Sequence, residues 1–244
     1  MMLIRSNEEP CRGTSPHERR VLKRILLLFY FCEIAMWIST LCYNYVPASF
    51  VHLSAAFYLV ILLTQVSFFH FVYRLTQQRA DEVFSFWHYL LPLLIAGLQE
   101  VWMLCVPFDV TLGLVESKGI PSAEYPVYSV YFLFKIKMRM IYSLFYTVWA
   151  LIRIYRYRQA VVNYSSDEER MSLSWLKVLV FLALVLVLLP LSIVFRERSY
   201  VFTAMFLMPF MVVLLLAQFV LLCYNFITGN YVQISLAGRS VEGV

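Results

Sequence analysis

Charged residues occur inside two long apolar runs, where charge is rare. Glu100 lies in one of these runs, and the next run carries three cations, Lys135, Lys137 and Arg139. Charge inside hydrocarbon is costly, so it is normally paired or functional. Lys135 and Arg139 are four residues apart and share a helix face, whereas Lys137 points elsewhere. With a rise of about 1.5 Å per residue, their depths predict an ion pair between Glu100 and either Arg139 or Lys135.

Two interpretations of this charge cluster stay open. In the first, it is a structural ion pair, accompanied by lysines that extend to the membrane interface. In the second, the cations line a polar cavity that opens to the outside and binds an anionic or polar ligand. Three cations against one acid leave a surplus of positive charge, which is why the second interpretation favours an anion.

Two further polar residues are expected near the middle of a membrane. Glu33 lies in the first apolar run, and Gln65 falls at a similar depth in the second. A short turn joins these runs, so their helices should be antiparallel and neighbouring. We therefore expect a hydrogen bond between the two side chains, which requires a neutral Glu33 or a further cation. A proton-linked role for Glu33 is the alternative.

A basic segment follows the fourth apolar run and is in turn followed by a helix-start signal. Arg153, Arg156 and Arg158 are typical of an anchor at the membrane interface, where basic side chains contact anionic lipid. Ser166 and Glu169 then fit a capping box, in which each side chain bonds the other residue's backbone amide. This pattern predicts a stalk of two helices projecting beyond the lipid. The stalk either transmits movement or is simply a long connection.

The chain lacks the patterns of known catalytic and metal-binding chemistry. Its four histidines show no metal spacing, its five cysteines are scattered, and neither a Walker loop, GxGxxG, GxSxG nor HExxH is present. We therefore expect no catalytic residue, metal, cofactor or direct contact with nucleic acid. A membrane-embedded enzyme is the weakest of the function classes considered.

Composition identifies the elements that must position these residues. The chain is 61% hydrophobic and only 14% charged, with a mean hydropathy of +0.73. Several apolar runs reach the roughly 20 residues that a helix needs to cross a bilayer. We predict an all-α polytopic membrane protein with six transmembrane helices in one domain. The predicted spans are about 23–46, 50–73, 86–106, 131–154, 173–195 and 200–226, within a domain at 21–228 between tails at 1–20 and 229–244.

Connections between the spans are expected to be short, except one. Pro47, Ala48 and Ser49 should form a tight turn, and 108–124 should be the longest loop. Of the twenty Lys and Arg, three would face outside, three lie inside the fourth span, and the other fourteen fall on the side of the termini. Because cytoplasmic segments carry the excess of Lys and Arg, we expect both termini in the cytoplasm and a location in the cell inner membrane.

One segment carries a family resemblance. Within 155–176, a Ser-x-x-Glu turn is followed by Leu-x-Trp-Leu. Here the chain resembles the multi-spanning N-terminal halves of Bacteroidetes-type AraC-family transcription regulators, and similar halves precede some sensor histidine kinases. The segment 224–235 resembles the part that follows their last span. The rest of the likeness is one of layout alone.

The resemblance implies signal input across a membrane, by a homodimer, towards a cytoplasmic output domain or partner protein. The chain ends at Val244, about where an output domain would begin, so we expect a separated sensor half or output from another protein. The residues of a DNA-binding domain are not present to be carried over. The alternative function is a small transporter that uses Glu100 with Lys135 or Arg139, although no internal repeat supports it.

Overall fold

The structure is a computed structural model, and it describes residues 16–78, 82–117, 122–162, 174–196 and 201–228. Every regular element in these ranges is an α-helix, which confirms the predicted all-α class. The described helices are α1 (Pro16–Tyr45), α2 (Pro47–His52), α3 (Ser54–Leu75), α4 (Trp87–Leu104), α5 (Phe108–Glu116), α6 (Pro126–Val162), α8 (Ser174–Arg196) and α9 (Val201–Ile227). The predicted tails and the capping-box residues Ser166 and Glu169 lie outside the described residues.

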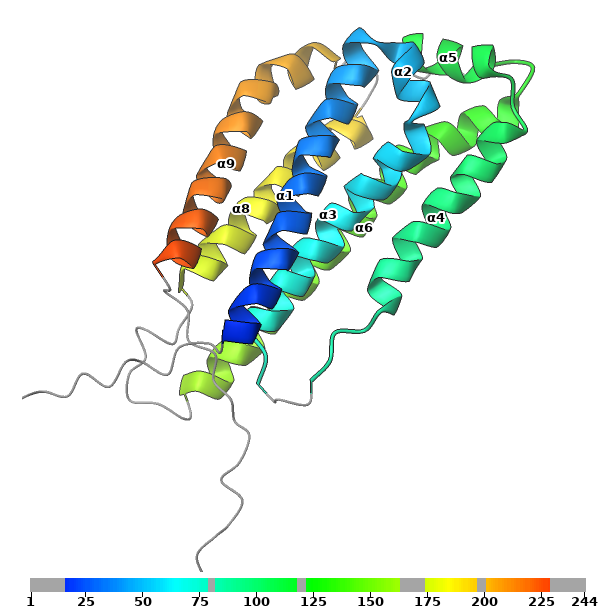
Figure 1. Cartoon of the computed structure of the whole chain (residues 1–244). Coiled ribbons are helices and arrows are strands. Elements are labelled where there is room, and N and C mark those ends of the chain that lie inside the picture. The colour runs from blue at the N-terminus through cyan, green and yellow to red at the C-terminus, as the bar shows by residue number, and fades with distance from the viewer. Residues whose placement is uncertain (1–15, 79–81, 118–121, 163–173, 197–200, 229–244) are drawn as a thin grey trace, which may run out of the picture.

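The long helices form a bundle with α3 near its centre (Figure 1). Helix α3 packs against α1, α4 and α6, while α8 lies between α6 and α9. The start of α1 and the end of α9 lie at the same end of the bundle, where α6 extends furthest (Figure 1). We call this the stalk end. The opposite end is covered by the short helices α2 and α5, and we call it the capped end.

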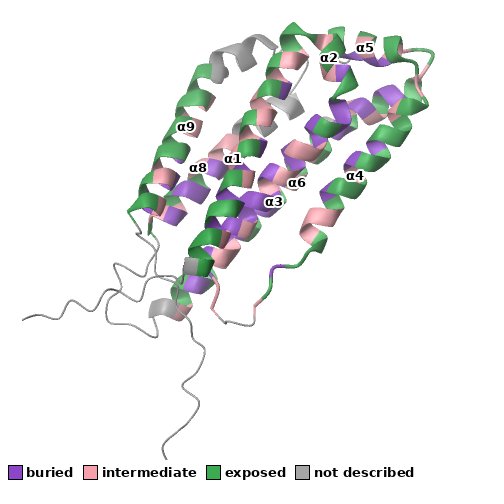
Figure 2. Cartoon of the chain, viewed as in Figure 1, coloured by how far each residue is buried: buried purple, intermediate pink, exposed green. Residues whose placement is uncertain are grey.

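Several helices have the length and composition needed to cross a membrane. Three meet both conditions on their own, namely His17–Tyr45, Ser54–Leu75 and Pro209–Ile227. Helices α4 and α5 add a fourth if the pair, bent by 112°, counts as one span. Helix α6, with three cations in its first half, is not among them. Exposed residues recur along the long helices (green in Figure 2), and many of them are large and apolar, as expected for a helical membrane protein.

The capped end differs from the prediction. The expected turn at Pro47 is the start of α2, because proline at the first helical position is already preset for a helix. The expected loop 108–124 contains α5, whose buried residues Thr111, Leu114 and Val115 recur at helical spacing. Val51 of α2 belongs to the same apolar cluster as Leu114 and Val115. The two short helices therefore form a packed cap rather than loose connections.

The main apolar core lies towards the stalk end. It joins α3 to α6 and α8, and its largest fully buried side chains include Phe69, Phe71, Ile154, Tyr157 and Leu179. Helix α6 runs without a break from Pro126 to Val162, the last residue described before the gap at 163–173. At about 1.5 Å per residue, its 37 residues correspond to roughly 55 Å of helix. One continuous helix thus links the capped end to the stalk end.

Candidate functional site

A cavity of about 260 Å³ lies in the capped half of the bundle, where α1, α2, α3 and α6 meet. Both polar and apolar side chains line it, and two of them are the cations singled out from the sequence. The lining residues are Ser39, Thr40 and Tyr43 of α1, Phe50 of α2, Ser54, Phe57, Tyr58 and Ile61 of α3, and Phe132, Lys135 and Arg139 of α6.

Lys135 is held inside this cavity by its neighbours. The side chain is 8% exposed, and its Nζ donates a hydrogen bond to Ser54 Oγ at 3.3 Å. The same nitrogen lies 4.8 Å from the ring centre of Phe132 and 5.4 Å from that of Tyr58, within the range of cation–π attraction. Tyr58 also donates to the Lys135 carbonyl at 3.4 Å. The ammonium is therefore fixed in place without any carboxylate.

Arg139 lies one helical turn further along α6 and is half-buried. Within the described part of the chain, its guanidinium makes no salt bridge and donates no hydrogen bond to a protein group. Among the described residues, neither Asp nor Glu lines the cavity. The site therefore concentrates two positive charges beside empty volume, which is an arrangement that attracts an anion.

Glu100 does not form the predicted ion pair. It is exposed on α4, and no salt bridge joins it to Lys135 or Arg139 among the described residues. The preceding residue, Gln99, is 1% exposed and donates from Nε2 to Ser54 Oγ at 3.1 Å. Successive residues are about 100° apart around a helix, so neighbouring positions face different surroundings. The prediction therefore chose the exposed Glu100 where the buried position is Gln99. Lys137 is exposed, on a different face from Lys135, as predicted.

Gln99 is the polar residue that sequence analysis missed at this site. Its Oε1 is buried and has no hydrogen-bond partner in the described structure. Ser54 accepts from both Gln99 and Lys135, so it joins α4 and α6 through the first residue of α3. The sequence did not single out Gln99, because an uncharged amide in an apolar run is a weaker signal than the neighbouring charge of Glu100.

Glu33 also faces a different neighbour from the one expected. It lines a small pocket of about 40 Å³ between α1 and α9, together with Gln218, which is 7% exposed. Glu33 Oε2 is buried there without a hydrogen-bond partner in the described structure. Gln65 is half-buried on α3 and makes no hydrogen bond to Glu33. The face of α1 that carries Glu33 is turned towards α9, so equal depth did not bring the predicted pair together.

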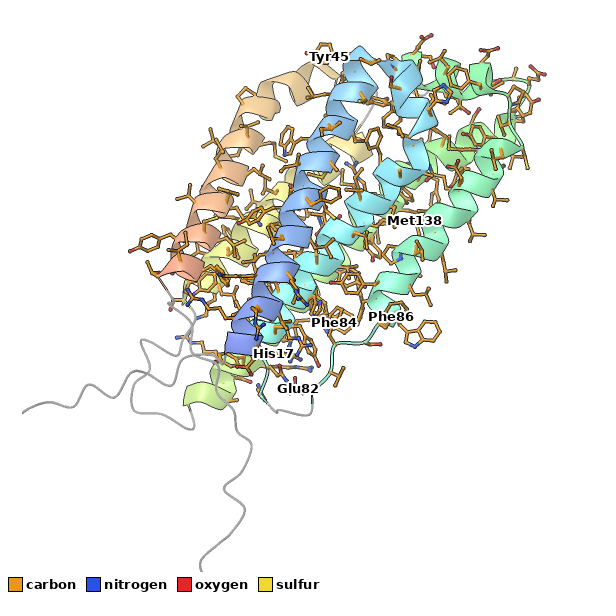
Figure 3. The ribbon with its side chains drawn as sticks, in the orientation of Figure 1. His17, Tyr45, Glu82, Phe84, Phe86 and Met138 are labelled. Atoms are coloured by element: carbon orange, nitrogen blue, oxygen red, sulfur yellow. The ribbon has the colours of Figure 1, made fainter. Side chains whose placement is uncertain are left out.

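The stalk end holds a second cation, Arg153 of α6, with a complete set of partners. Its Nη2 forms a salt bridge with Glu82 Oε2. Its Nε donates to Thr76 Oγ1 at 3.0 Å, and its guanidinium carbon lies 3.7 Å from the ring centre of Tyr73. These contacts tie α6 to the end of α3 and to the segment that connects α3 with α4. Figure 3 shows Glu82 close to the start of α1, far from the cap.

An aromatic and histidine cluster lies beside Arg153, and we call it the Phe84 cluster. Phe84, which is 8% exposed, stacks on His70 with 4.0 Å between ring centres and 10° between ring planes. His70 Nδ1 shares a 2.8 Å hydrogen bond with the Tyr89 hydroxyl, and His88 Nδ1 shares one of 2.9 Å with the Tyr146 hydroxyl. The sequence analysis found no metal spacing among these histidines and assigned them to no site. The sequence did contain a sign of this cluster, because an acidic residue and several aromatic residues occur together at 82–89.

The two sites lie on one face of α6. Lys135, Arg139, Tyr142, Tyr146 and Arg153 are separated by four, three, four and seven residues. This spacing keeps side chains on one stripe of a helix. The rings of Tyr142 and Tyr146 are 4.8 Å apart along it. The stripe therefore runs from the cavity to the Phe84 cluster without leaving the helix.

The remaining basic residues of the predicted stalk, Arg156 and Arg158, are exposed. The described residues hold no group of three or more His, Cys, Asp or Glu side chains that could bind a metal ion.

A search of protein-family models, curated proteins and solved structures finds no match to this chain. The resemblance of 155–176 to membrane regulators therefore stays a prediction from the sequence.

Proposed function

We propose that this protein is a polytopic membrane sensory module that binds an anionic or polar ligand in the cavity and transmits the event through α6. One observation carries the proposal. The stripe on α6 places two cations in a cavity at one end, and at the other end places Arg153 in contact with the α3–α4 connection. A movement of α6 caused by ligand binding therefore reaches Glu82 and the Phe84 cluster.

The proposal includes six spans, formed by α1, α3, α4, α6, α8 and α9. It is supported by the position of the described ends of the bundle, since a chain that starts and finishes on one side crosses an even number of times (Figure 1). The excess of Lys and Arg predicted for the side of the termini assigns the stalk end to the cytoplasm. The capped end then faces the outside of the inner membrane.

The depth of the cavity fits a ligand that arrives from outside. Lys135 bonds to Ser54, the first residue of α3, so the ammonium lies at the level where α3 emerges beneath the cap. A cation at that depth avoids most of the cost of burial in the middle of a membrane. The cavity therefore lies near the proposed outer surface and is buried enough to strengthen an interaction with an anion.

Packing below the cavity favours a sensor over a carrier. The cavity ends at Ile61 and Arg139, and beyond it α3 and α6 meet through large buried side chains such as Phe69 and Tyr146. A carrier would have to open this packing in every cycle, whereas a sensor needs only to shift it. A homodimer and a cytoplasmic output domain or partner complete the proposal, and both come from the resemblance seen in the sequence.

Hydrogen exchange tests the proposal on the full chain in lipid nanodiscs. Acetate, benzoate and inorganic phosphate are added separately, and exchange is followed in a peptide covering 82–89. We expect at least one anion to change the exchange rate of this peptide about twofold or more, since ligand binding shifts local opening equilibria. The effect should be lost in Arg139→Gln and kept in Lys137→Gln, which removes a cation outside the cavity.

An unchanged exchange rate with all three anions in the wild-type protein would contradict the sensory proposal. Uptake of one of these anions into sealed vesicles, abolished by Arg139→Gln, would instead identify a carrier. The two results are separate, because uptake is measured inside the vesicle and exchange is measured at the stalk end.

A further inference from the structure

We infer that the ligand of the cavity is a small monocarboxylate with a compact apolar body of about six carbons, a size that matches the cavity volume of about 260 Å³. This inference rests on the proposed function and names its ligand class. Arg139 binds the carboxylate, Lys135 supports it, and the apolar wall of the cavity holds the body. Each part follows from a separate property of the site.

Charge is the first property. Lys135 already has a hydroxyl acceptor and two aromatic rings, which partly replace its lost hydration. Arg139 has no such compensation from the described residues and borders empty volume. One negative charge placed at Arg139 therefore pairs with a cation to which the described residues offer no carboxylate. A dianion would instead have to lose more of its own hydration against a wall that is largely apolar.

Geometry is the second property. A guanidinium presents its N–H groups in a planar fork that matches the two oxygens of a carboxylate. Arg139 and Lys135 are one turn apart on the same face of α6, so an anion held by Arg139 lies within the electric field of the Lys135 ammonium. Ser39, which is 3% exposed, supplies a hydroxyl on the facing helix α1. The polar part of the cavity thus has room for one small planar anion.

The apolar wall is the third property. Phe50, Phe57, Ile61 and Phe132 contribute rings and an aliphatic chain to the same cavity. A fully hydrated ion such as inorganic phosphate would keep its water shell, so these apolar side chains would stay in contact with water. An attached hydrocarbon body would cover them, and burial of apolar area is worth about 25 cal/mol per Å². The wall therefore selects an amphipathic anion rather than a bare one.

Size is the fourth property. A cavity of about 150 Å³ holds a benzene molecule, so a volume of about 260 Å³ has room for a six-carbon body together with a carboxylate. Benzoate and hexanoate match this size, acetate leaves most of the cavity empty, and decanoate exceeds it. Benzoate and hexanoate share the chemistry proposed here and differ in whether the body is a flat ring or a flexible chain.

Thermal unfolding of the purified full chain in detergent tests the ligand class. Benzoate, hexanoate, acetate, decanoate, inorganic phosphate and the neutral benzyl alcohol are titrated in turn, and the rise in Tm gives an apparent Kd for each. We expect benzoate or hexanoate to bind at least about tenfold more tightly than acetate, phosphate, decanoate and benzyl alcohol, because only these two fill the cavity and supply the charge. The tighter of the two identifies the shape of the body.

Variants locate the binding site. Arg139→Gln should weaken benzoate or hexanoate about tenfold or more, as expected when a hydrogen bond to a charged group is lost. Arg139→Lys, which keeps the charge and loses the fork, should bind with intermediate affinity. Lys137→Gln removes a cation from an exposed position of the same helix and should leave the affinity unchanged. The comparison of benzoate with benzyl alcohol needs no variant, so it stands even if Arg139→Gln fails to fold.

Two results would overturn the inference while leaving the proposed function in place. Equal binding of benzyl alcohol and benzoate would show that the carboxylate is not recognised. Tighter binding of phosphate or acetate, dependent on Arg139, would show that the apolar wall does not select the ligand. Failure of every anion to bind, together with unchanged exchange at 82–89, would remove the proposed function as well.

Discussion

The cavity and the stalk end are built on the same two helices and treat their cations in opposite ways. At the stalk end, Arg153 has a carboxylate, a hydroxyl and an aromatic ring as partners. In the cavity, Lys135 relies on a hydroxyl and rings, and Arg139 has no partner among the described residues. A cation that is fully satisfied by the fold holds structure together, whereas one left beside empty volume is available to a ligand. Stability measurements should therefore separate the two ends.

Removal of the Phe84 ring should have the largest effect on stability. Phe84→Ala leaves a hole between α3, α4 and α6, and we expect a loss of about 3 kcal/mol in the free energy of unfolding. Phe86→Ala is the matched control, because this ring is 71% exposed and should cost little. Denaturant titration of both variants in the same detergent measures the difference. Equal losses would mean that Phe84 is not buried in the cluster.

Removal of the paired cation, Arg153, should have the second largest effect on stability. Arg153→Ala leaves Glu82 without its partner and removes the contact with Tyr73. Both charged side chains are about a quarter exposed, so solvent screening limits the expected loss to about 2 kcal/mol. Arg156→Ala, on an exposed position of the same helix, should change the free energy of unfolding little. A similar loss in both variants would show that general positive charge, not the contact set, stabilises this end.

Removal of the unpaired cation should act in the opposite direction. Arg139→Met replaces a charge that lacks a counterion with an apolar side chain, and we expect a gain of about 1 kcal/mol in the free energy of unfolding. Binding of an anion in the cavity should be lost at the same time, because sites kept for function are often costly to the fold. Lys137→Met is the control, with little expected change. A loss of stability in Arg139→Met would end the contrast between the two ends.

The smallest effect should come from Glu100. Glu100→Gln should change the free energy of unfolding by less than about 0.5 kcal/mol, since the residue is exposed and lies one turn from the end of α4. The same denaturant titration measures it. A loss above about 2 kcal/mol, the size expected for breaking a buried pair, would restore the ion pair that the sequence suggested.

Sequence predicted what depends on pattern along the chain and missed what depends on rotation around a helix. The long apolar runs predicted the all-α class, and every described element is a helix. The one-residue difference between Gln99 and Glu100, by contrast, is set by how α4 packs on α3. The partner of Glu33 is likewise decided by the neighbour that its face of α1 meets. Such choices involve contacts between distant segments, which spacing within one run cannot specify.

The residues of the candidate site could likewise be predicted where they share one helix and not where they come from distant segments. Lys135 and Arg139 could be placed together because both belong to one helix, and four residues fix their relative direction. Ser54, which bonds to Lys135, carried no signal because a single serine in an apolar run is common. The helix α5 was hidden by its glycine and its acidic residues, which are also typical of loops. The apolar residues that bury α5 against α2 lie more than fifty positions away in the chain.

The short link between α2 and α3 has a mechanical consequence for the cap. Leu53 alone separates the two helices, and its backbone amide donates to the Ser49 carbonyl. Any tilt of α2 therefore turns Ser54, the residue that receives hydrogen bonds from both Gln99 and Lys135. We therefore expect loosening of the α2–α5 contact to weaken the hydrogen bond that holds the Lys135 ammonium. If the cavity takes up a ligand as proposed, the strength of the α2–α5 contact should set how fast the ligand enters and leaves.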